Sequence, residues 1–241
     1  RAIRTMERIG PYNHALNIVP EAVCKIADVG DVPFRSRFKL EQCIEDIEVH
    51  FRRIIESDVR PLGIGGDHSI SYPILKAIAA KHGPVAMVHI DAHCDTSGEY
   101  DGSKFHHGGP FRLAVLEGLI DPDRTIQIGI RGAQNFTDGW DYSRESGMRV
   151  VFMHEAEEIG PDAVVAEARR VIGDGPVYLS FDIDALDPVH APGTGTPEIG
   201  GFTSREAQRI LRGLRGLDFV GADLVEVSPP FDHAQITALA G

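Results

Sequence analysis

The stretch VAMVHIDAHCD, residues 85–95, begins as a run of mainly apolar residues and ends in acidic ones. Its first six residues have the nearly continuous hydrophobic character of a strand that is buried on both faces of a parallel sheet. Asp91, His93 and Asp95 follow directly. Side chains two positions apart on an extended chain point to the same side, so Asp91 and His93 share a face. The stretch therefore predicts a buried strand that delivers ionisable groups to one place.

Similar apolar runs recur along the chain and alternate with helical segments. Strands are predicted at 60–64, 85–90, 125–130, 148–153, 177–183 and 219–227, and helices at 39–57, 71–81, 161–172 and 204–214. Thr203 and Glu206 form a capping-box pattern before the last helix, and Asp121 with Pro122 predicts a turn before the third strand. This rhythm predicts a three-layer α/β/α sandwich with a mainly parallel central sheet, formed by residues 1–241 as a single domain.

Composition excludes several classes of partner. The 24 basic residues stand against 36 acidic ones, giving a formal charge of -12. This charge disfavours binding to nucleic acid and favours cations. The three cysteines have neither metal-binding spacing nor disulfide density, which indicates a reducing, cytoplasmic location. No apolar run approaches the ~20 residues that span a bilayer, so no membrane contact is expected.

Ionisable residues follow three of the predicted strands, in GIGGDHS, HIDAHCD and SFDIDALDP. The carboxyl ends of parallel strands meet at one edge of a sheet, where ligands bind. Unpaired carboxylates gathered there would repel one another, and none of the three motifs contains lysine or arginine. Aspartate at any one strand end is often structural, but three such motifs favour a metal site. The candidate ligands are His68, Asp91, His93, Asp95, Asp182 and Asp184.

This ligand set suits two manganese-like ions, because carboxylate oxygen and imidazole nitrogen are their preferred donors and no thiolate pair indicates structural zinc. Four carboxylates balance two dications. Coordination lowers the pKa of water from ~15.7 towards ~7, which makes hydroxide available at neutral pH. The set therefore predicts a hydrolase with two manganese-like dications.

Four neighbouring residues are given supporting roles. Asp67 is expected to accept a hydrogen bond from the ring of His68 rather than to touch metal. His89 lies deeper in its strand and is expected to be a hydrogen-bonded core histidine, or one that supports the ligands, rather than a ligand itself. Asp187 is interpreted as a structural or supporting carboxylate, and Cys94 as a small buried hydrophobe.

The motifs GGDHS, HIDAHCDT, FHHGGPF, SFDIDALDP, APGTGTPEIGG and DLVEVSPPFDH occur in this order. Together they resemble the ureohydrolases, the arginase and agmatinase group, and most closely the agmatinase branch. The resemblance implies the arginase-like fold, a homotrimer or homohexamer, and a chain that lacks the first strand and the final helix of the family. It also implies two manganese sites, one formed by His68, Asp91, Asp95 and Asp182 and the other by Asp91, His93, Asp182 and Asp184.

The resemblance further implies that His107 is the mobile acid/base group and that Glu226 receives a guanidinium. A carboxylate suits this role because it can hold the planar, forked guanidinium by charge-assisted hydrogen bonds. Asp95 is expected to relay a proton to the leaving amine, while His107 exchanges protons with solvent. The predicted products are urea and an amine.

The loop after Asp95, TSGEYDGSKFHHGGP, lacks the asparagine and serine pattern of arginases, which disfavours arginine as the substrate. Glu99 and Asp101 would suit the ammonium of agmatine. Lys104 would suit the carboxylate of a guanidino acid such as 4-guanidinobutyrate or guanidinopropionate. Conversion of agmatine to putrescine and urea is the first expectation, and a guanidino-acid ureohydrolase is the alternative.

Two other classes of protein remain open. A mononuclear zinc deacetylase on a related fold would use fewer ligands and a histidine pair, for which His106 and His107 are the candidates. A catalytically silent subunit would keep the core motifs but lose His107 or Glu226. The number of metal ions per chain separates the deacetylase from the ureohydrolase.

Overall fold

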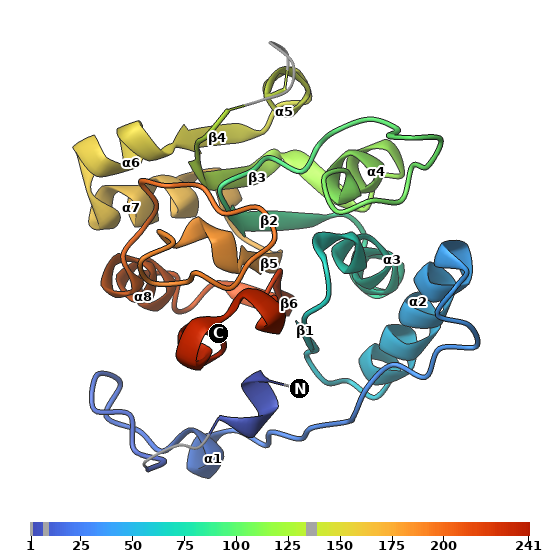
Figure 1. The fold of residues 1–241 in the computed structure, drawn as a ribbon, viewed down its shortest axis with the longest axis horizontal. Helices are drawn as coiled ribbons and strands as arrows, with labels where there is room; N and C mark the ends of the chain where they lie inside the picture. Colours follow the sequence, from blue (N-terminus) through green and yellow to red (C-terminus); the bar gives the residue numbers. More distant parts are fainter. Residues whose placement is uncertain (1, 7–9, 134–138) are drawn as a thin grey trace.

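The computed structural model describes residues 2–6, 10–133 and 139–241. Within these ranges the strands form one sheet in the order β1-β6-β5-β2-β3-β4, and every neighbouring pair is parallel (Figure 1). The strands are β1 (Leu62–Ile64), β2 (Val85–Ile90), β3 (Ile120–Ile130), β4 (Arg149–Phe152), β5 (Pro176–Asp182) and β6 (Asp218–Val225). The central position of β2 and β5 confirms that the opening stretch belongs to the buried middle of the sheet.

Helices cover both faces of the sheet, which confirms the predicted three-layer architecture (Figure 1). One face carries α2 (Leu40–Glu56), α3 (Ser71–His82) and α4 (Pro110–Leu116); the other carries α6 (Met153–Ile159), α7 (Pro161–Ile172) and α8 (Ser204–Gly213). The shorter elements are η1 (Ile3–Thr5), α1 (Pro20–Val23), η2 (His68–Ile70), α5 (Asp141–Glu145), η3 (Ile183–Ala185), η4 (Pro229–Phe231), η5 (His233–Gln235) and α9 (Ile236–Ala240).

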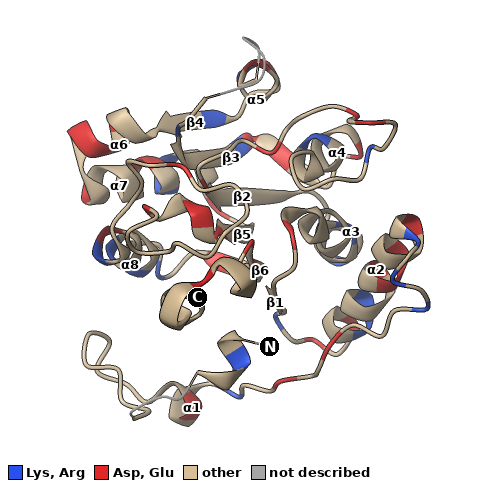
Figure 2. Cartoon of the chain, viewed as in Figure 1, with Lys and Arg blue, Asp and Glu red and all other residues tan. Residues whose placement is uncertain are grey.

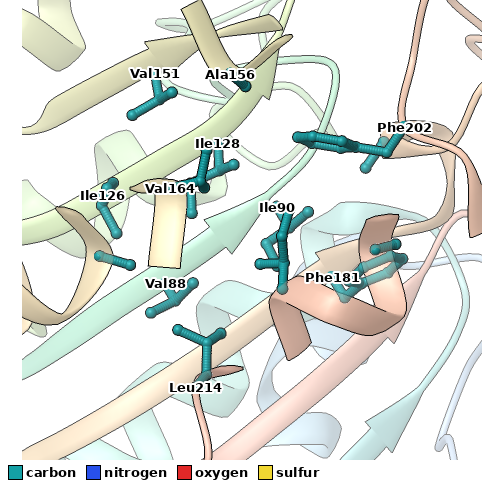
Figure 3. Close-up of a cluster of buried hydrophobic side chains, with 14 of the residues drawn as sticks. Val88, Ile90, Ile126, Ile128, Val151, Ala156, Val164, Phe181, Phe202 and Leu214 are labelled. Carbon is teal, nitrogen blue, oxygen red and sulfur yellow. The ribbon is translucent and has the colours of Figure 1, made fainter. Parts of the chain in front are cut away.

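Each face of the sheet has its own apolar core. Figure 3 shows the cluster under α7 and α8, where Val88, Ile128 and Val164 interlock with no exposed surface. The cluster on the opposite face includes Ile74 of α3 and Phe111 of α4. Burial of this apolar surface is the main stabilising contribution, and it holds the strand ends in fixed positions.

The predicted helices are confirmed to within one residue at each end, and the capping box is present. Glu206 N donates to Thr203 Oγ1 at 3.2 Å, and Thr203 N donates to Glu206 Oε2 at 2.9 Å. The turn predicted at Asp121 and Pro122 is wrong as a strand boundary, because β3 already begins at Ile120. The β3 strand bulges there instead. On β2 a single residue, Ala86, separates two positions that pair with β3, whereas on β3 residues 121–124 separate the two partners.

Arg131, just after β3, fixes the long loop that follows β5. Its guanidinium donates to the carbonyl oxygens of Asp184 at 2.7 Å and Glu198 at 2.8 Å, and only 9% of the residue is exposed. Asp187 accepts from the backbone N–H groups of Val189 at 3.0 Å and Gly200 at 2.8 Å. These contacts confirm the structural interpretation of Asp187. They hold the loop in place along the carboxyl edge of the sheet.

No described helix, within residues 2–6, 10–133 and 139–241, has both the length and the apolar character that crossing a membrane requires.

Substituting Gly201→Ala should destabilise this loop by about 1–3 kcal/mol. A Cβ atom there would lie 2.6 Å from Asp187 N and 2.8 Å from Ala185 O, and neither backbone atom can move aside easily. Chemical denaturation measures the loss. Gly10→Ala is the matched control, because its Cβ would meet nothing within 4 Å; equal stabilities for the two variants would contradict the rigid loop.

Candidate metal centre

The structure brings all six predicted ligands together at the carboxyl edge of the sheet. Figure 2 shows acidic segments in this region, near the ends of β5 and β6. His68 Nδ1 lies 2.8 Å from Asp95 Oδ2 and 3.2 Å from an oxygen of both Asp91 and Asp182. On the other side of Asp91, His93 Nδ1 lies 3.5 Å from Oδ1 of that residue and 3.2 Å from Asp184 Oδ2. Asp91 therefore stands between two groups of donors.

The cluster fits a metal centre. His68, Asp91, Asp182 and Asp184 are at most 2% exposed. His68 Nδ1 is buried and, among the described residues, has no hydrogen-bond partner of suitable geometry, although three carboxylates surround it. Ligand atoms of Asp91, His93 and Asp184 also lie within 4.8 Å of one another. Buried charge of this kind requires a compensating cation, and a dication among these oxygen and nitrogen donors supplies it.

Ionisation of the metal-free cluster reflects the same crowding. Burial alone would lower the pKa of His93, but its contacts with Asp184 and Asp91 prevail and raise it to about 11. Asp182, Asp91 and Asp95 likewise raise the pKa of His68 well above its usual value against the effect of burial. Burial and the neighbouring negative charges raise the pKa of Asp182 and Asp184. Without metal the cluster therefore retains protons that ligands must release.

His89 is buried against the cluster, and its ligand atom lies within 4.8 Å of those of His68 and Asp91. Its Nε2 lies 2.7 Å from Asp91 Oδ2, and its Nδ1 lies 3.0 Å from Gln127 Nε2. Gln127 Nε2 also donates to Cys94 O at 2.6 Å, and a carbonyl can only accept, so the amide nitrogen must face this side. His89 Nδ1 then accepts from Gln127, and Nε2–H donates to Asp91. The predicted core role of His89 is confirmed.

Gln127 itself was missed by the sequence analysis. The available signal was a polar side chain within the apolar run TIQIGI. Cys94 is 3% exposed, which confirms its interpretation as a small buried residue, and burial raises the pKa of its thiol to about 12.

The role predicted for Asp67 is wrong. Its Oδ1 accepts from Ser69 N at 2.9 Å and caps η2, because the extended backbone of Asp67 turns directly into that helix. The ring of His68 instead points Nε2 at Ser180 Oγ, 2.8 Å away. The sequence analysis missed Ser180. Its signal was a hydroxyl in a buried strand, two residues before Asp182 and on the same face of β5.

Glu226 and His107 lie beside the cluster at different depths. Glu226, just after β6, accepts from His68 N at 2.9 Å, and its Oε1 lies 3.9 Å from His107 Nδ1. The Glu226 side chain is 13% exposed and that of His107 is 54% exposed. Burial raises the pKa of Glu226, while the His68 N–H opposes that shift. These two residues thus lead from solvent towards the buried carboxylates.

Two acidic residues of the site adopt left-handed backbone conformations, Asp95 at φ 51° and Glu226 at φ 63°. Residues other than glycine occupy this region at an energetic cost, and such strain is concentrated at functional sites. Glu226 comes directly after β6, whereas Asp95 lies in the loop that follows β2, which ends at Ile90. At Glu226 the change of direction takes the side chain out of the strand alternation of β6.

The loop between Asp95 and α4 keeps its histidine pair apart. His106 Nε2 lies 2.7 Å from Gly98 O, so this ring is bound to its own loop. His107 lies near Glu226. Lys104 Nζ lies 5.0 Å from the centre of the Phe105 ring, and Glu99 and Asp101 are exposed. The pair does not supply the two adjacent imidazoles that the deacetylase alternative requires.

Comparison with known proteins gives the family. The model of the Arginase family matches residues 1–241. The chain belongs to the arginase family. Arginase-family proteins are metal-dependent ureohydrolases, and the chain is accordingly a hydrolase of guanidino compounds. This confirms the resemblance that the motifs indicated.

Within the arginase family, guanidinopropionase of Pseudomonas aeruginosa is 50% identical over 95% of this chain and 72% of its own length. The mitochondrial agmatinase of Gallus gallus is 48% identical over 95% of this chain and 67% of its own length. The solved proclavaminate amidino hydrolase of Streptomyces clavuligerus superimposes with a TM-score of 0.93 at 40% identity, covering 99% of this chain and 79% of that one. Relatives with different substrates are thus almost equally similar.

Metal uptake by this arginase-family chain should release about two protons at pH ~7.5. His68 and His93 hold protons in the metal-free cluster at that pH, and both must lose them before their Nδ1 atoms can bind metal. Since protons compete with the metal, apparent affinity should rise as the pH rises. Calorimetric titration of the chelator-treated protein with Mn²⁺, in two buffers of different ionisation enthalpy, counts the protons. Uptake without proton release would contradict the assignment of these two ligands.

Proposed function

We propose that the protein is a ureohydrolase with two Mn²⁺ ions per subunit, which converts agmatine to putrescine and urea. The observation that carries this proposal is Asp91 standing between two donor groups, with Glu226 beside them. His68, Asp95 and Asp182 would complete one ion site together with Asp91. His93, Asp182 and Asp184 would complete the other. The bound dications supply an activated water as the nucleophile of hydrolysis.

Glu226 binds and orients the guanidinium. Its Oε1 already accepts from His68 N, so the carboxylate is held in place before the substrate arrives. A cationic guanidinium offers parallel N–H donors to such a carboxylate, and the charge-assisted contact offsets the burial that raises the Glu226 pKa. The central carbon of the substrate is thereby directed towards the six-residue cluster.

His107 and Asp95 handle protons. The leaving amine needs a proton when its bond to carbon breaks, and Asp95 is within the cluster where that bond lies. His107 is half exposed and 3.9 Å from Glu226, so it can exchange protons between this site and solvent. One buried and one exposed group would thus share the proton transfer.

The charges around the site support agmatine, which carries two positive groups. Glu99 and Asp101 outnumber Lys104 in the loop that carries His107, and the chain has a net charge of -12. A guanidino acid is the second candidate, because a guanidinopropionase is 50% identical to this chain. Lys104 is the residue that would favour its carboxylate.

Four finer points stay predictions: residues 1–241 as a single domain, assembly as a homotrimer or homohexamer, a cytoplasmic location, and manganese rather than nickel or another dication.

Urea release should be measured for agmatine, 4-guanidinobutyrate, guanidinopropionate, arginine and guanidine after loading with Mn²⁺. Agmatine is expected to have the highest kcat/KM, and chelation should abolish the activity. A preference for a guanidino acid would overturn only the choice of substrate. Absence of urea from every compound would overturn the proposed function.

Glu226→Gln should reduce kcat/KM by about 100-fold or more, since it replaces the charged acceptor of the guanidinium with a neutral amide. Bound manganese, measured by elemental analysis, should not change, because Glu226 is not among the proposed ligands. Glu158→Gln on α6 removes an equal charge at an exposed position and should retain full activity. Loss of metal in Glu226→Gln would contradict its assignment as a substrate residue.

A further inference from the structure

Asp223 is a buried carboxylate that belongs to none of the roles above. It lies on β6 with 1% of its surface exposed, directly across from Ser180 in the register of β5 and β6. Three hydroxyl groups donate to it: Ser180 Oγ at 2.7 Å, Ser71 Oγ at 2.6 Å, and Tyr178 OH. All three donors are fully buried. Burial of this many polar groups between the sheet and α3 costs free energy, so we expect the arrangement to have a function.

The hydroxyl of Ser180 connects Asp223 to the metal centre. It has a single proton, and an ionised carboxylate can only accept. The proton of Ser180 therefore points to Asp223 Oδ1, and the oxygen of Ser180 is left to accept from His68 Nε2, 2.8 Å away. Nε2 must then carry the ring proton of a neutral His68. This leaves Nδ1, which faces the three carboxylates, free to bind metal.

Ser71 and Tyr178 complete the arrangement on the second oxygen of Asp223. Both donate to Oδ2, so they leave Oδ1 to Ser180. Burial and the negative charge of Asp223 raise the pKa of Tyr178 well above its usual value, so its phenol remains a donor. The hydrogen bonds thus run in one direction, from the ring of His68 through Ser180 to Asp223.

We propose that Asp223 is a positioning residue of the metal centre, which acts through Ser180 to hold the His68 ring with Nδ1 directed at the metal. The inference rests on the metal centre of the proposed function. It differs from a purely structural role, in which Asp223 would only tie β5, β6 and α3 together. Loss of Asp223 should weaken metal binding in protein that is still folded.

The test is Mn²⁺ binding by chelator-treated protein, measured by calorimetry and by the electron paramagnetic resonance signal of free Mn²⁺. Asp223→Asn should weaken the binding of one of the two ions by about tenfold or more. Ser180→Ala should do the same. The double variant should bind no more weakly than Ser180→Ala alone, within about twofold, because Asp223 acts through Ser180.

Tyr178→Phe is the matched control, since it removes a hydroxyl from the same carboxylate but leaves the path from Ser180 to His68 intact. Its Mn²⁺ affinity should stay within about twofold of the parent protein. Folding of each metal-free variant is checked by circular dichroism and by its melting temperature. If Asp223→Asn does not fold, Asp223→Ser replaces it and must show the same loss.

Three results would overturn the inference: parent-like affinity in the folded Asp223 variant, multiplied losses in the double variant, or an equal loss in Tyr178→Phe. Each leaves the proposed function intact if the parent protein binds two ions and releases urea. A parent protein that binds no Mn²⁺ would overturn the metal centre itself, and the inference with it.

Discussion

The arrangement of the whole carboxyl edge depends on compensation of buried negative charge. Two unit charges about 4 Å apart repel by about 4 kcal/mol at the effective dielectric constant of ~20 that suits protein sites. Asp91, Asp182 and Asp184 are nearly inaccessible to solvent, so water cannot reduce that repulsion. In the metal-free chain, protons on the imidazoles of His68 and His93 supply part of this compensation. Dications would replace those protons, and this exchange couples the chemistry of the site to its stability.

The rest of the fold limits how far the charged groups can move apart. β2 and β5 are hydrogen-bonded neighbours in the middle of the sheet, with apolar cores on both faces. Arg131 holds the backbone of Asp184 through its carbonyl, and His89 holds the side chain of Asp91. The repulsive cluster is therefore maintained by packing and hydrogen bonds around it. A flexible edge would relieve the repulsion by spreading, and it would lose the metal geometry.

Local patterns were sufficient to predict the layers, most strands and the candidate ligands. The common edge of a parallel sheet brings Asp91 and His93 to His68 and Asp184. The expected strand parity is not what groups Asp91 with His93, because β2 ends at Ile90 and His93 N donates to Asp91 Oδ1 in the turn that follows. Contacts that depend on register between distant strands could not be derived in this way. Ser180 meets Asp223 because β5 and β6 pair at that register, and no spacing within either strand encodes it. Asp67 was misassigned because its side chain caps η2 instead of contacting the ring of His68.

The depth of each group orders the site from solvent inwards. His107 is half exposed, Glu226 is mostly buried, and the cluster behind it is nearly closed to water. On the proposed path a guanidinium would meet negative charge that is less hydrated with depth, so electrostatic attraction would strengthen towards the buried carboxylates. The left-handed backbone of Glu226, directly after β6, serves the same geometry, because continued strand alternation would turn every second side chain towards the opposite face of the sheet. Strained backbone at Glu226, and at Asp95 in the loop after β2, thus accompanies the gathering of carboxylates from distant parts of the chain at one site.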